Sequence, residues 1–207
     1  MTSESSRRDI VEYGKALYQK GLTVGTAGNI SARGERDTML ITPTNTCKGM
    51  LEQDRLVAIN IRDGKVLSGG RPSIETPFHL AFYRARPEIN AVIHTHPVYC
   101  TALAAKGIRV EPGLTPEGLR VLGREVPMVP YATPGTDDLA KALSDALRTS
   151  DSFLLEKHGA IAVGRNMAEA FHRMETLEFM AQLQFNLRIL GGAEPLPDEE
   201  IGRILRK

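Results

Sequence analysis

Two histidines in the segment 91–99 (AVIHTHPVY) have the spacing of paired metal ligands. Strand-forming residues lead into His94 and His96, and Pro97 ends the pattern. Side chains two residues apart on a strand lie on one face, about 6.6 Å apart along the chain, so both imidazoles can reach one ion. A lone histidine is more often hydrogen-bonded or exposed, and the pair therefore needs a third ligand to indicate a metal site.

The third candidate ligand is His158, which follows the apolar run 152–155 and precedes Gly159. Three neutral imidazoles with one open position are typical of catalytic zinc, whereas structural zinc sites close the fourth position, usually with cysteine. The sequence therefore predicts a metal-dependent enzyme that binds Zn²⁺, or another divalent transition metal such as Mn²⁺, at these histidines. For His79 and His172, which lie in helix-like segments with apolar neighbours, packing or surface roles are expected.

The overall composition favours one globular domain that binds a small molecule. The chain has 207 residues, 42% of them apolar, which suffices for a single domain over 1–207. Its 26 basic and 25 acidic residues are dispersed, so no nucleic-acid or membrane partner is expected. We see no secretory signal, no apolar span of about 20 residues and no disulfide framework for the two cysteines, and we expect a cytoplasmic protein.

Hydrophobic periodicity and turn residues predict alternating helices and strands. Helices are expected over 4–20, 76–86, 99–105, 137–148, 167–190 and 197–207. Strands are expected over 39–42, 56–61, 65–67, 91–94, 126–129, 153–155 and 160–163, with a hairpin at Asp63-Gly64 and an irregular region over 107–123. This order indicates an α/β fold in which helices cover both faces of a mixed sheet.

Two polar turns suit an anion. The segment 24–31 (VGTAGNIS) contains two glycines and small polar residues that leave backbone N–H groups available, and 43–45 (PTN) is a second such turn. Amides in this arrangement can bind phosphate, although a plain glycine turn is the commoner explanation. Glu75 begins the helix 76–86, where a carboxylate favours the helix dipole, and it has a catalytic role only if it lies near the metal.

Six short motifs in this order resemble the class II aldolase/adducin superfamily, most closely its L-fuculose-1-phosphate aldolase branch. They are GTAGNIS at 25–31, ITPT at 41–44, PSIE at 72–75, AVIHTH at 91–96, PYAT at 130–133 and KHG at 157–159. The resemblance implies a three-layer α/β/α fold with a central mixed, largely antiparallel sheet. It also implies a homotetramer in which the segment 107–123 or the C-terminal tail lies near a neighbouring site.

The same resemblance implies roles for single residues. His94, His96 and His158 match the zinc ligands of the family, and Glu75 matches its catalytic acid/base. The phosphate of a sugar phosphate substrate would be bound by Thr26, Gly28, Asn29, Thr44 and Ser73. The implied reaction cleaves a ketose 1-phosphate to dihydroxyacetone phosphate and an aldehyde through an enediolate that a divalent metal stabilises. Burial of the carboxylate is expected to raise its pKa toward the working range.

Departures from the aldolase pattern leave the substrate open. Ile74 stands where the aldolases have a second serine, Asn45 where they have a glycine, and the segment 104–129 lacks the tyrosine that donates a proton in the family. Glu117 lies near that position and is a candidate acid, although a glutamate in such a loop is usually solvated.

Other members of the superfamily supply the alternatives to an aldolase. The segment 42–45 (TPTN) resembles sugar-acid phosphate decarboxylases, so decarboxylation is the main alternative, beside 4-epimerisation of a pentulose phosphate. A non-catalytic adducin-like module is the least favoured, because all three histidines are present.

Overall fold

The structure, a computed structural model, describes residues 3–143 and 146–206, which form eight strands and seven α-helices. The strands are β1 (Asn29–Arg33), β2 (Thr38–Ile41), β3 (Val57–Asn60), β4 (Val66–Ser68), β5 (Ala91–Thr95), β6 (Met128–Val129), β7 (Ser152–Leu155) and β8 (Gly159–Gly164). The helices are α1 (Ser3–Gln19), α2 (Thr76–Ala85), α3 (Val98–Lys106), α4 (Pro116–Leu122), α5 (Asp137–Leu143), α6 (Met167–Ile189) and α7 (Asp198–Leu205).

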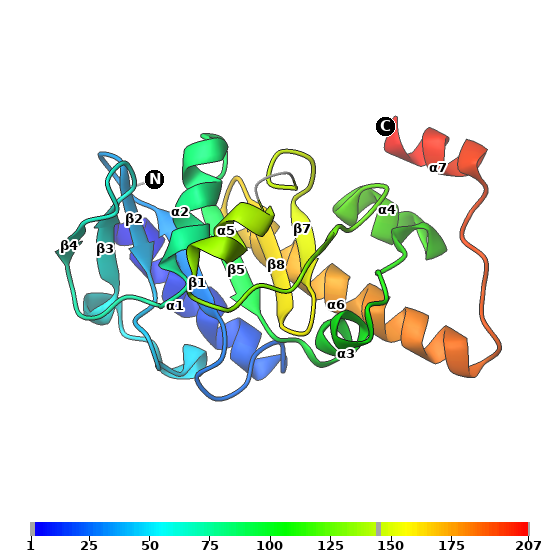
Figure 1. The fold of residues 1–207 in the computed structure, drawn as a ribbon, viewed down its shortest axis with the longest axis horizontal. Coiled ribbons are helices and arrows are strands. Elements are labelled where there is room, and N and C mark those ends of the chain that lie inside the picture. The colour runs from blue at the N-terminus through cyan, green and yellow to red at the C-terminus, as the bar shows by residue number, and fades with distance from the viewer. Residues whose placement is uncertain (1–2, 144–145, 207) are drawn as a thin grey trace.

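One sheet runs through the molecule in the order β4-β3-β2-β1-β5-β8-β7-β6 (Figure 1). Every neighbouring pair is antiparallel except β6 and β7, which are parallel. The expected mixed, largely antiparallel sheet is therefore confirmed. The strand that carries His94 lies at the centre of this order, where its backbone is paired on both sides.

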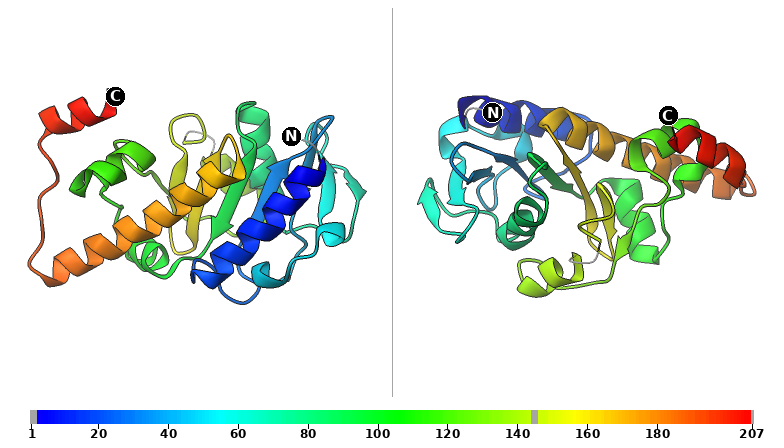
Figure 2. Two further views of the ribbon diagram at one scale, coloured as in Figure 1. Left: turned by 180° about the vertical axis from the view of Figure 1, so that it is seen from behind. Right: turned by 90° about the horizontal axis from the view of Figure 1, so that it is seen from above.

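Helices cover both faces of the sheet, as Figure 2 shows from above. One hydrophobic cluster joins α1, α3 and α6 to one face, and a second joins α2 and α5 to the other. Along β5, Ala91 and Ile93 face the first cluster and Val92 faces the second, because side chains alternate along a strand. The predicted three-layer α/β/α arrangement is thus confirmed.

The segment 107–123, predicted as irregular, contains a short 3₁₀ turn and the helix α4. The side chain of Thr115 caps this helix by accepting a hydrogen bond from the Gly118 amide, Pro116 occupies its first turn, and Gly123 ends it with φ 81°. Proline at a helix start and glycine just past its end are favourable positions for both residues. The prediction of an irregular segment was therefore wrong for residues 116–122.

Strand β1 (Asn29–Arg33) was not predicted, because its first residues were assigned to the polar turn 24–31. The other helices and strands lie close to their predicted positions. Helix α5 is described to Leu143, so the predicted helix 137–148 runs into residues 144–145, which lie outside the described residues. Beyond the sheet, the second half of α6 and the tail that carries α7 extend to one side of the molecule (Figure 1). None of the described helices is long and apolar enough to cross a lipid bilayer.

Candidate metal centre

The three predicted histidine ligands converge where the central strands β5, β7 and β8 meet at their ends. His94 is fully buried on β5, His96 follows the end of that strand, and His158 lies in the turn between β7 and β8. Pairing of Thr95 with Ala160 brings this turn beside the end of β5. The three ring centroids lie 4.7–5.0 Å apart, and one nitrogen from each ring lies within 4.8 Å of the others.

The donor set fits a divalent transition metal. His94 Nδ1 lies 2.9 Å from the carbonyl oxygen of Ala160, which can only accept, so Nδ1 carries the hydrogen and Nε2 keeps its lone pair. That Nε2 atom lies 3.1 Å from Nε2 of His96. Burial, together with repulsion by His94, lowers the pKa of His96 to about 3 and that of His158 to about 4. These two imidazoles are therefore neutral at pH 7, the form that binds metal.

Glu75 lies against the histidines with one carboxylate oxygen anchored and one without a partner. Oε2 accepts a hydrogen bond of 2.7 Å from Asn29 Nδ2 and lies 3.3 Å from His94 Nε2. Oε1 lies 3.5 Å from His158 Nε2, and it is buried without a hydrogen bond from any described residue. A buried polar atom in this state indicates a missing ligand or a reacting group, which also fits a metal beside it.

The pKa of Glu75 differs from the sequence-based expectation. Burial raises it, but the close approach of His94 Nε2 to Oε2 and the hydrogen bond from Asn29 outweigh burial and leave the pKa below its ordinary value. The expected rise was wrong because burial alone was considered. The carboxylate is therefore ionised and ready to accept a proton.

The predicted phosphate-binding residues lie around Glu75 on three neighbouring segments. The Ser73 amide donates to the carbonyl of Thr42, and the Thr44 amide donates to that of Arg71, which joins the second turn to the segment before Glu75. Gly28 closely approaches β5, where a Cβ would lie 2.5 Å from the carbonyl oxygen of His94. Asn29 pairs with His94 in the sheet. These contacts place the first turn beside His94 and the second beside the segment that leads to Glu75.

Asn45 preserves the shape of its turn. Its φ of 56° is the left-handed conformation, which glycine adopts freely and asparagine tolerates better than most residues. The replacement of the aldolase glycine by Asn45 is therefore compatible with the same backbone. Ile74, the other departure, points outward with 53% of its surface exposed.

Lys48 is a buried cation that the sequence analysis missed. Its side chain is 1% exposed, and Nζ donates to the carbonyl oxygens of Thr26 at 2.8 Å and Thr46 at 2.6 Å, so that it links the two polar turns. Within the described part of the chain, no carboxylate lies close enough to form an ion pair with it. Burial lowers the pKa of Lys48 to about 8, so its ammonium group is still mostly protonated at pH 7. A lysine in a short polar segment gives no sequence signal of burial.

Glu117 lies apart from the histidines of its own chain. It is in the first turn of α4, its side chain is 71% exposed, and its carboxylate lies 3.6 Å from Arg120. Among the described residues, no hydrogen bond or ion pair joins it to Glu75 or to the histidines.

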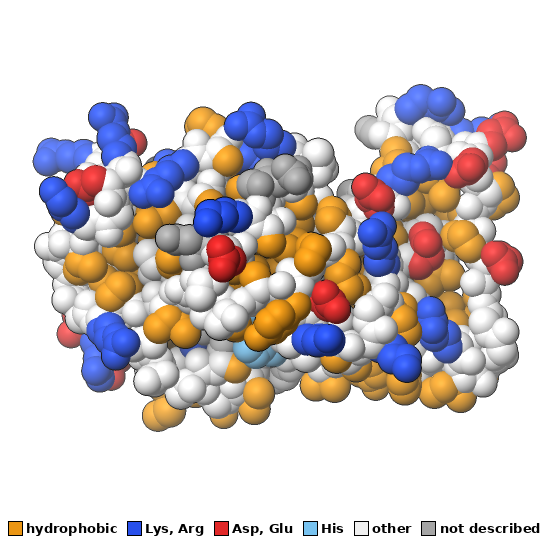
Figure 3. Space-filling view, viewed as in Figure 1, with side chains coloured by type: hydrophobic (Ala, Val, Ile, Leu, Met, Phe, Trp, Pro, Cys, Tyr) orange, Lys and Arg blue, Asp and Glu red, His pale blue; other side chains and the backbone are white. Residues whose placement is uncertain are grey.

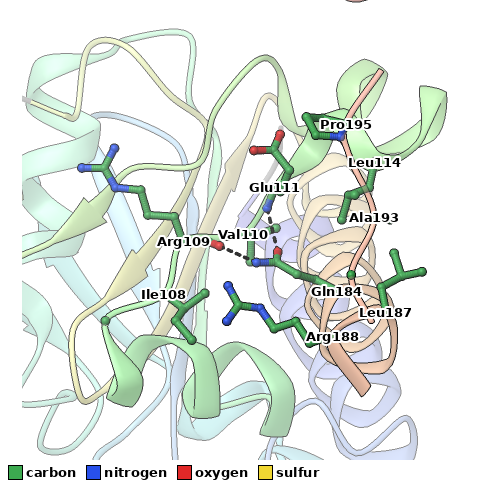
Figure 4. A pocket seen from close by; sticks show the side chains of 12 residues that line it. Ile108, Arg109, Val110, Glu111, Leu114, Gln184, Leu187, Arg188, Ala193 and Pro195 are labelled. Atoms are coloured by element: carbon green, nitrogen blue, oxygen red, sulfur yellow. Dashed lines mark hydrogen bonds between the residues drawn. The ribbon is translucent and has the colours of Figure 1, made fainter. Parts of the chain in front are cut away.

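A separate cavity of about 640 Å³ lies between the segment 107–111, helix α6 and the tail (Figure 4). Gln184 crosses it, donating to the Arg109 carbonyl and accepting from the Glu111 amide. The candidate metal centre lies elsewhere, where histidine atoms reach the surface near the end of β5 (Figure 3).

Comparison with known proteins gives several matches over nearly the whole chain. The sequence model described as class II aldolase and adducin N-terminal domain matches residues 8–185. The chain is 36% identical over 193 residues to 3-oxo-tetronate 4-phosphate decarboxylase of Haemophilus influenzae, covering 91% of this chain and 90% of that relative. It is 38% identical over 203 residues to L-fuculose phosphate aldolase of Escherichia coli, covering 97% and 92%. The solved structure of an L-fuculose 1-phosphate aldolase is similar with a TM-score of 0.92 at 33% identity, covering 100% of this chain and 97% of that one.

We predict that His94→Ala and His158→Ala each abolish retention of zinc, because two imidazoles alone hold the ion too weakly to survive dialysis. Metal analysis of the purified variants measures this. His172→Ala is the matched control, since that side chain is 68% exposed and should keep the wild-type zinc content. Full zinc content in both variants would contradict the ligand assignment.

We also predict that zinc affinity changes little under mild acid. Two ordinary imidazoles would together lose about 100-fold in affinity between about pH 7.5 and 5.5, because each would bind a proton. The lowered pKa values of His96 and His158 keep these rings neutral over that range, so we expect a loss of about 10-fold or less. Competition titration with a zinc indicator measures the dissociation constants, and a loss of about 100-fold or more would contradict the lowered pKa values.

Proposed function

Because the chain belongs to the class II aldolase and adducin family, we propose that it is a metal-dependent lyase that decarboxylates a phosphorylated 3-oxo sugar acid. The observation that carries this proposal is the site itself, with three neutral histidines beside an ionised Glu75 whose Oε1 has no partner among the described residues. Zn²⁺ is the proposed metal at His94, His96 and His158. A bound divalent cation would supply positive charge to stabilise an enediolate.

Glu75 is proposed to transfer a proton. Loss of carbon dioxide breaks the bond between the carboxyl carbon and its neighbour, and the electron pair passes into the adjacent ketone to form an enediolate. The ionised carboxylate first takes up a proton from the solvent, and the substrate hydroxyl keeps its own. Oε1, the oxygen not held by Asn29, then delivers the proton to the carbon that lost the carboxyl group. With a 3-oxo-tetronate 4-phosphate the product is dihydroxyacetone phosphate.

The lack of an evident proton donor for a leaving aldehyde supports decarboxylation over aldol cleavage. Aldol chemistry also needs an acid at the oxygen of the leaving aldehyde, whereas carbon dioxide leaves without one. The segment 104–129 contains no tyrosine, and Glu117 is exposed in its own chain. Similarity to the decarboxylase of H. influenzae and the motif at 42–45 support the same choice.

Aldol cleavage of a ketose 1-phosphate is the second candidate, supported by similarity to L-fuculose phosphate aldolase over nearly the whole chain. Both reactions would give the same three-carbon enediolate phosphate, and only the leaving fragment differs. In this case Glu117 of a neighbouring subunit is the proposed acid.

We propose that the phosphate binds at Thr26, Gly28, Asn29, Thr44 and Ser73. The burial of Lys48 between the two turns supports this, since a buried ammonium without a carboxylate partner favours an anionic ligand nearby.

We propose a cytoplasmic location and a homotetramer. The homotetramer is supported by large apolar side chains exposed on α6 and at its end, where this helix extends beyond the sheet: Phe179, Phe185, Ile189 and Leu190. Such surfaces commonly form subunit contacts. Light scattering on the purified protein measures the number of subunits.

To test the reaction, we predict that zinc-loaded protein releases carbon dioxide from 3-oxo sugar-acid 4-phosphates and releases little aldehyde from ketose 1-phosphates. Because dihydroxyacetone phosphate is expected from both, carbon dioxide and aldehyde must each be measured. Aldehyde without carbon dioxide would favour the aldolase, and neither product from the panel would contradict both candidates.

The proposed role of Glu75 is tested with Glu75→Gln, which should keep its zinc. We expect exchange of hydrogen for deuterium in dihydroxyacetone phosphate, followed by NMR in deuterated water, to slow by about 100-fold or more. Wild-type exchange in the variant would show that another group moves the proton.

We predict that Lys48→Met weakens binding of inorganic phosphate by about 10-fold, because methionine keeps the length of the side chain and removes its charge. Isothermal titration of zinc-loaded protein measures the dissociation constant. Lys141→Met is the control, since this lysine is 77% exposed on α5. Equal affinity in wild type and Lys48→Met would remove Lys48 from the phosphate site.

A further inference from the structure

A chain of buried hydrogen bonds runs from Glu75 into the core. Asn29 Nδ2 donates to Glu75 Oε2 at 2.7 Å, and Asn29 Oδ1 lies 2.5 Å from His79 Nε2. His79 Nδ1 lies 2.7 Å from Ser31 Oγ, which lies 2.9 Å from the hydroxyl of Tyr83. All five residues are buried, and they come from β1, α2 and the residue that precedes α2.

The chemistry of each group fixes the direction of these bonds. An ionised carboxylate only accepts, so the amide nitrogen of Asn29 faces Glu75 and its amide oxygen faces His79. An amide oxygen also only accepts, and His79 Nε2 must therefore carry a hydrogen. Full burial disfavours a second proton on His79, whose pKa is lowered to about 3, so Nδ1 is an acceptor.

Because His79 Nδ1 is an acceptor, the directions of the hydrogen bonds made by Ser31 and Tyr83 follow. Ser31 donates its hydroxyl hydrogen to His79 Nδ1, and its oxygen accepts from Tyr83. Burial raises the pKa of Tyr83, which keeps the phenol protonated as a donor. Each hydrogen bond from Tyr83 to Asn29 is thus donated toward Glu75, and the chemistry of the groups allows only this set of directions.

We propose that His79 is a positioning residue, which as the neutral Nε2–H tautomer holds the Asn29 amide in the orientation that anchors Glu75 Oε2. Glu75 Oε1 then remains the one oxygen that faces the substrate. This assignment differs from the packing role expected from the sequence, although the ring also stacks on Phe78 with centroids 4.5 Å apart. The catalytic consequence rests on the proposed role of Glu75, whereas the tautomer does not.

The direct test is NMR of the zinc-loaded wild-type protein with ¹⁵N-labelled histidine. His79→Gln identifies the His79 signals by their disappearance. We expect the hydrogen on Nε2 and an unprotonated Nδ1, unchanged between about pH 6 and 8. A hydrogen on Nδ1 alone, or on both nitrogens, would overturn the proposal. This result needs no turnover, so it stands apart from failure of the proposed reaction.

The functional test compares His79→Leu with His79→Gln, whose side-chain amide can still donate toward Asn29. We expect His79→Leu to keep its zinc and its KM for dihydroxyacetone phosphate exchange within about 3-fold, while kcat falls by about 10-fold or more. His79→Gln should recover part of kcat, and His172→Leu should match the wild type.

An unchanged kcat in His79→Leu would overturn the positioning role. So would loss of zinc in parallel with activity, because it would make His79 a support of the histidine cluster. If His79→Leu does not fold, Ser31→Ala replaces it, since this change removes the donor to Nδ1, and the acceptor of Tyr83, while the His79 ring stays in place. Because Asn29 Oδ1 still only accepts, we then expect the hydrogen to remain on Nε2, and its transfer to Nδ1 would overturn the assignment.

Discussion

A carboxylate and three imidazoles share one buried corner of an apolar sheet, and the cost of burying that charge constrains the residues around it. Glu75 is 6% exposed, and a buried carboxylate is strongly unfavourable unless it is paired and hydrogen-bonded. Asn29 supplies the hydrogen bond, and the proposed cation at the three histidines would supply the opposite charge. Because Asn29 is paired with His94 in the sheet, the register of β1 against β5 fixes the carboxylate and the first ligand together. Strand register is therefore a functional property of this protein.

Sequence patterns predicted the parts of the site that depend on local spacing or on motif order. His94 and His96 could be paired because a strand places alternate side chains on one face, and His158 was added as a third imidazole after an apolar run. The order of motifs then indicated the role of Glu75. Lys48 and His79 escaped prediction because their roles depend on neighbours distant in the sequence. A lysine between two turns and a histidine inside a helical stripe resemble ordinary surface and core residues. The sign of the pKa shift at Glu75 was missed for the same reason, since it depends on two partners that burial alone does not reveal.

A shared enediolate would explain why the family could be identified more readily than the substrate. The proposed metal ligands, proton carrier and phosphate turns would all act on the three carbons that both candidate reactions have in common. The leaving fragment lies outside this set. Side chains around it would be free to differ without disturbing the common chemistry.

The burial of His94 has a consequence for how an ion would enter and leave. This ligand is fully buried on β5, whereas His96, just after that strand, and His158, in the turn between β7 and β8, are partly exposed. An incoming cation would meet the two outer rings first and reach the inner one last, and departure would require the reverse order. Exchange with the medium would then require the outer pair to release the ion. The metal recovered with the protein would record the supply during synthesis as much as the equilibrium preference of the site.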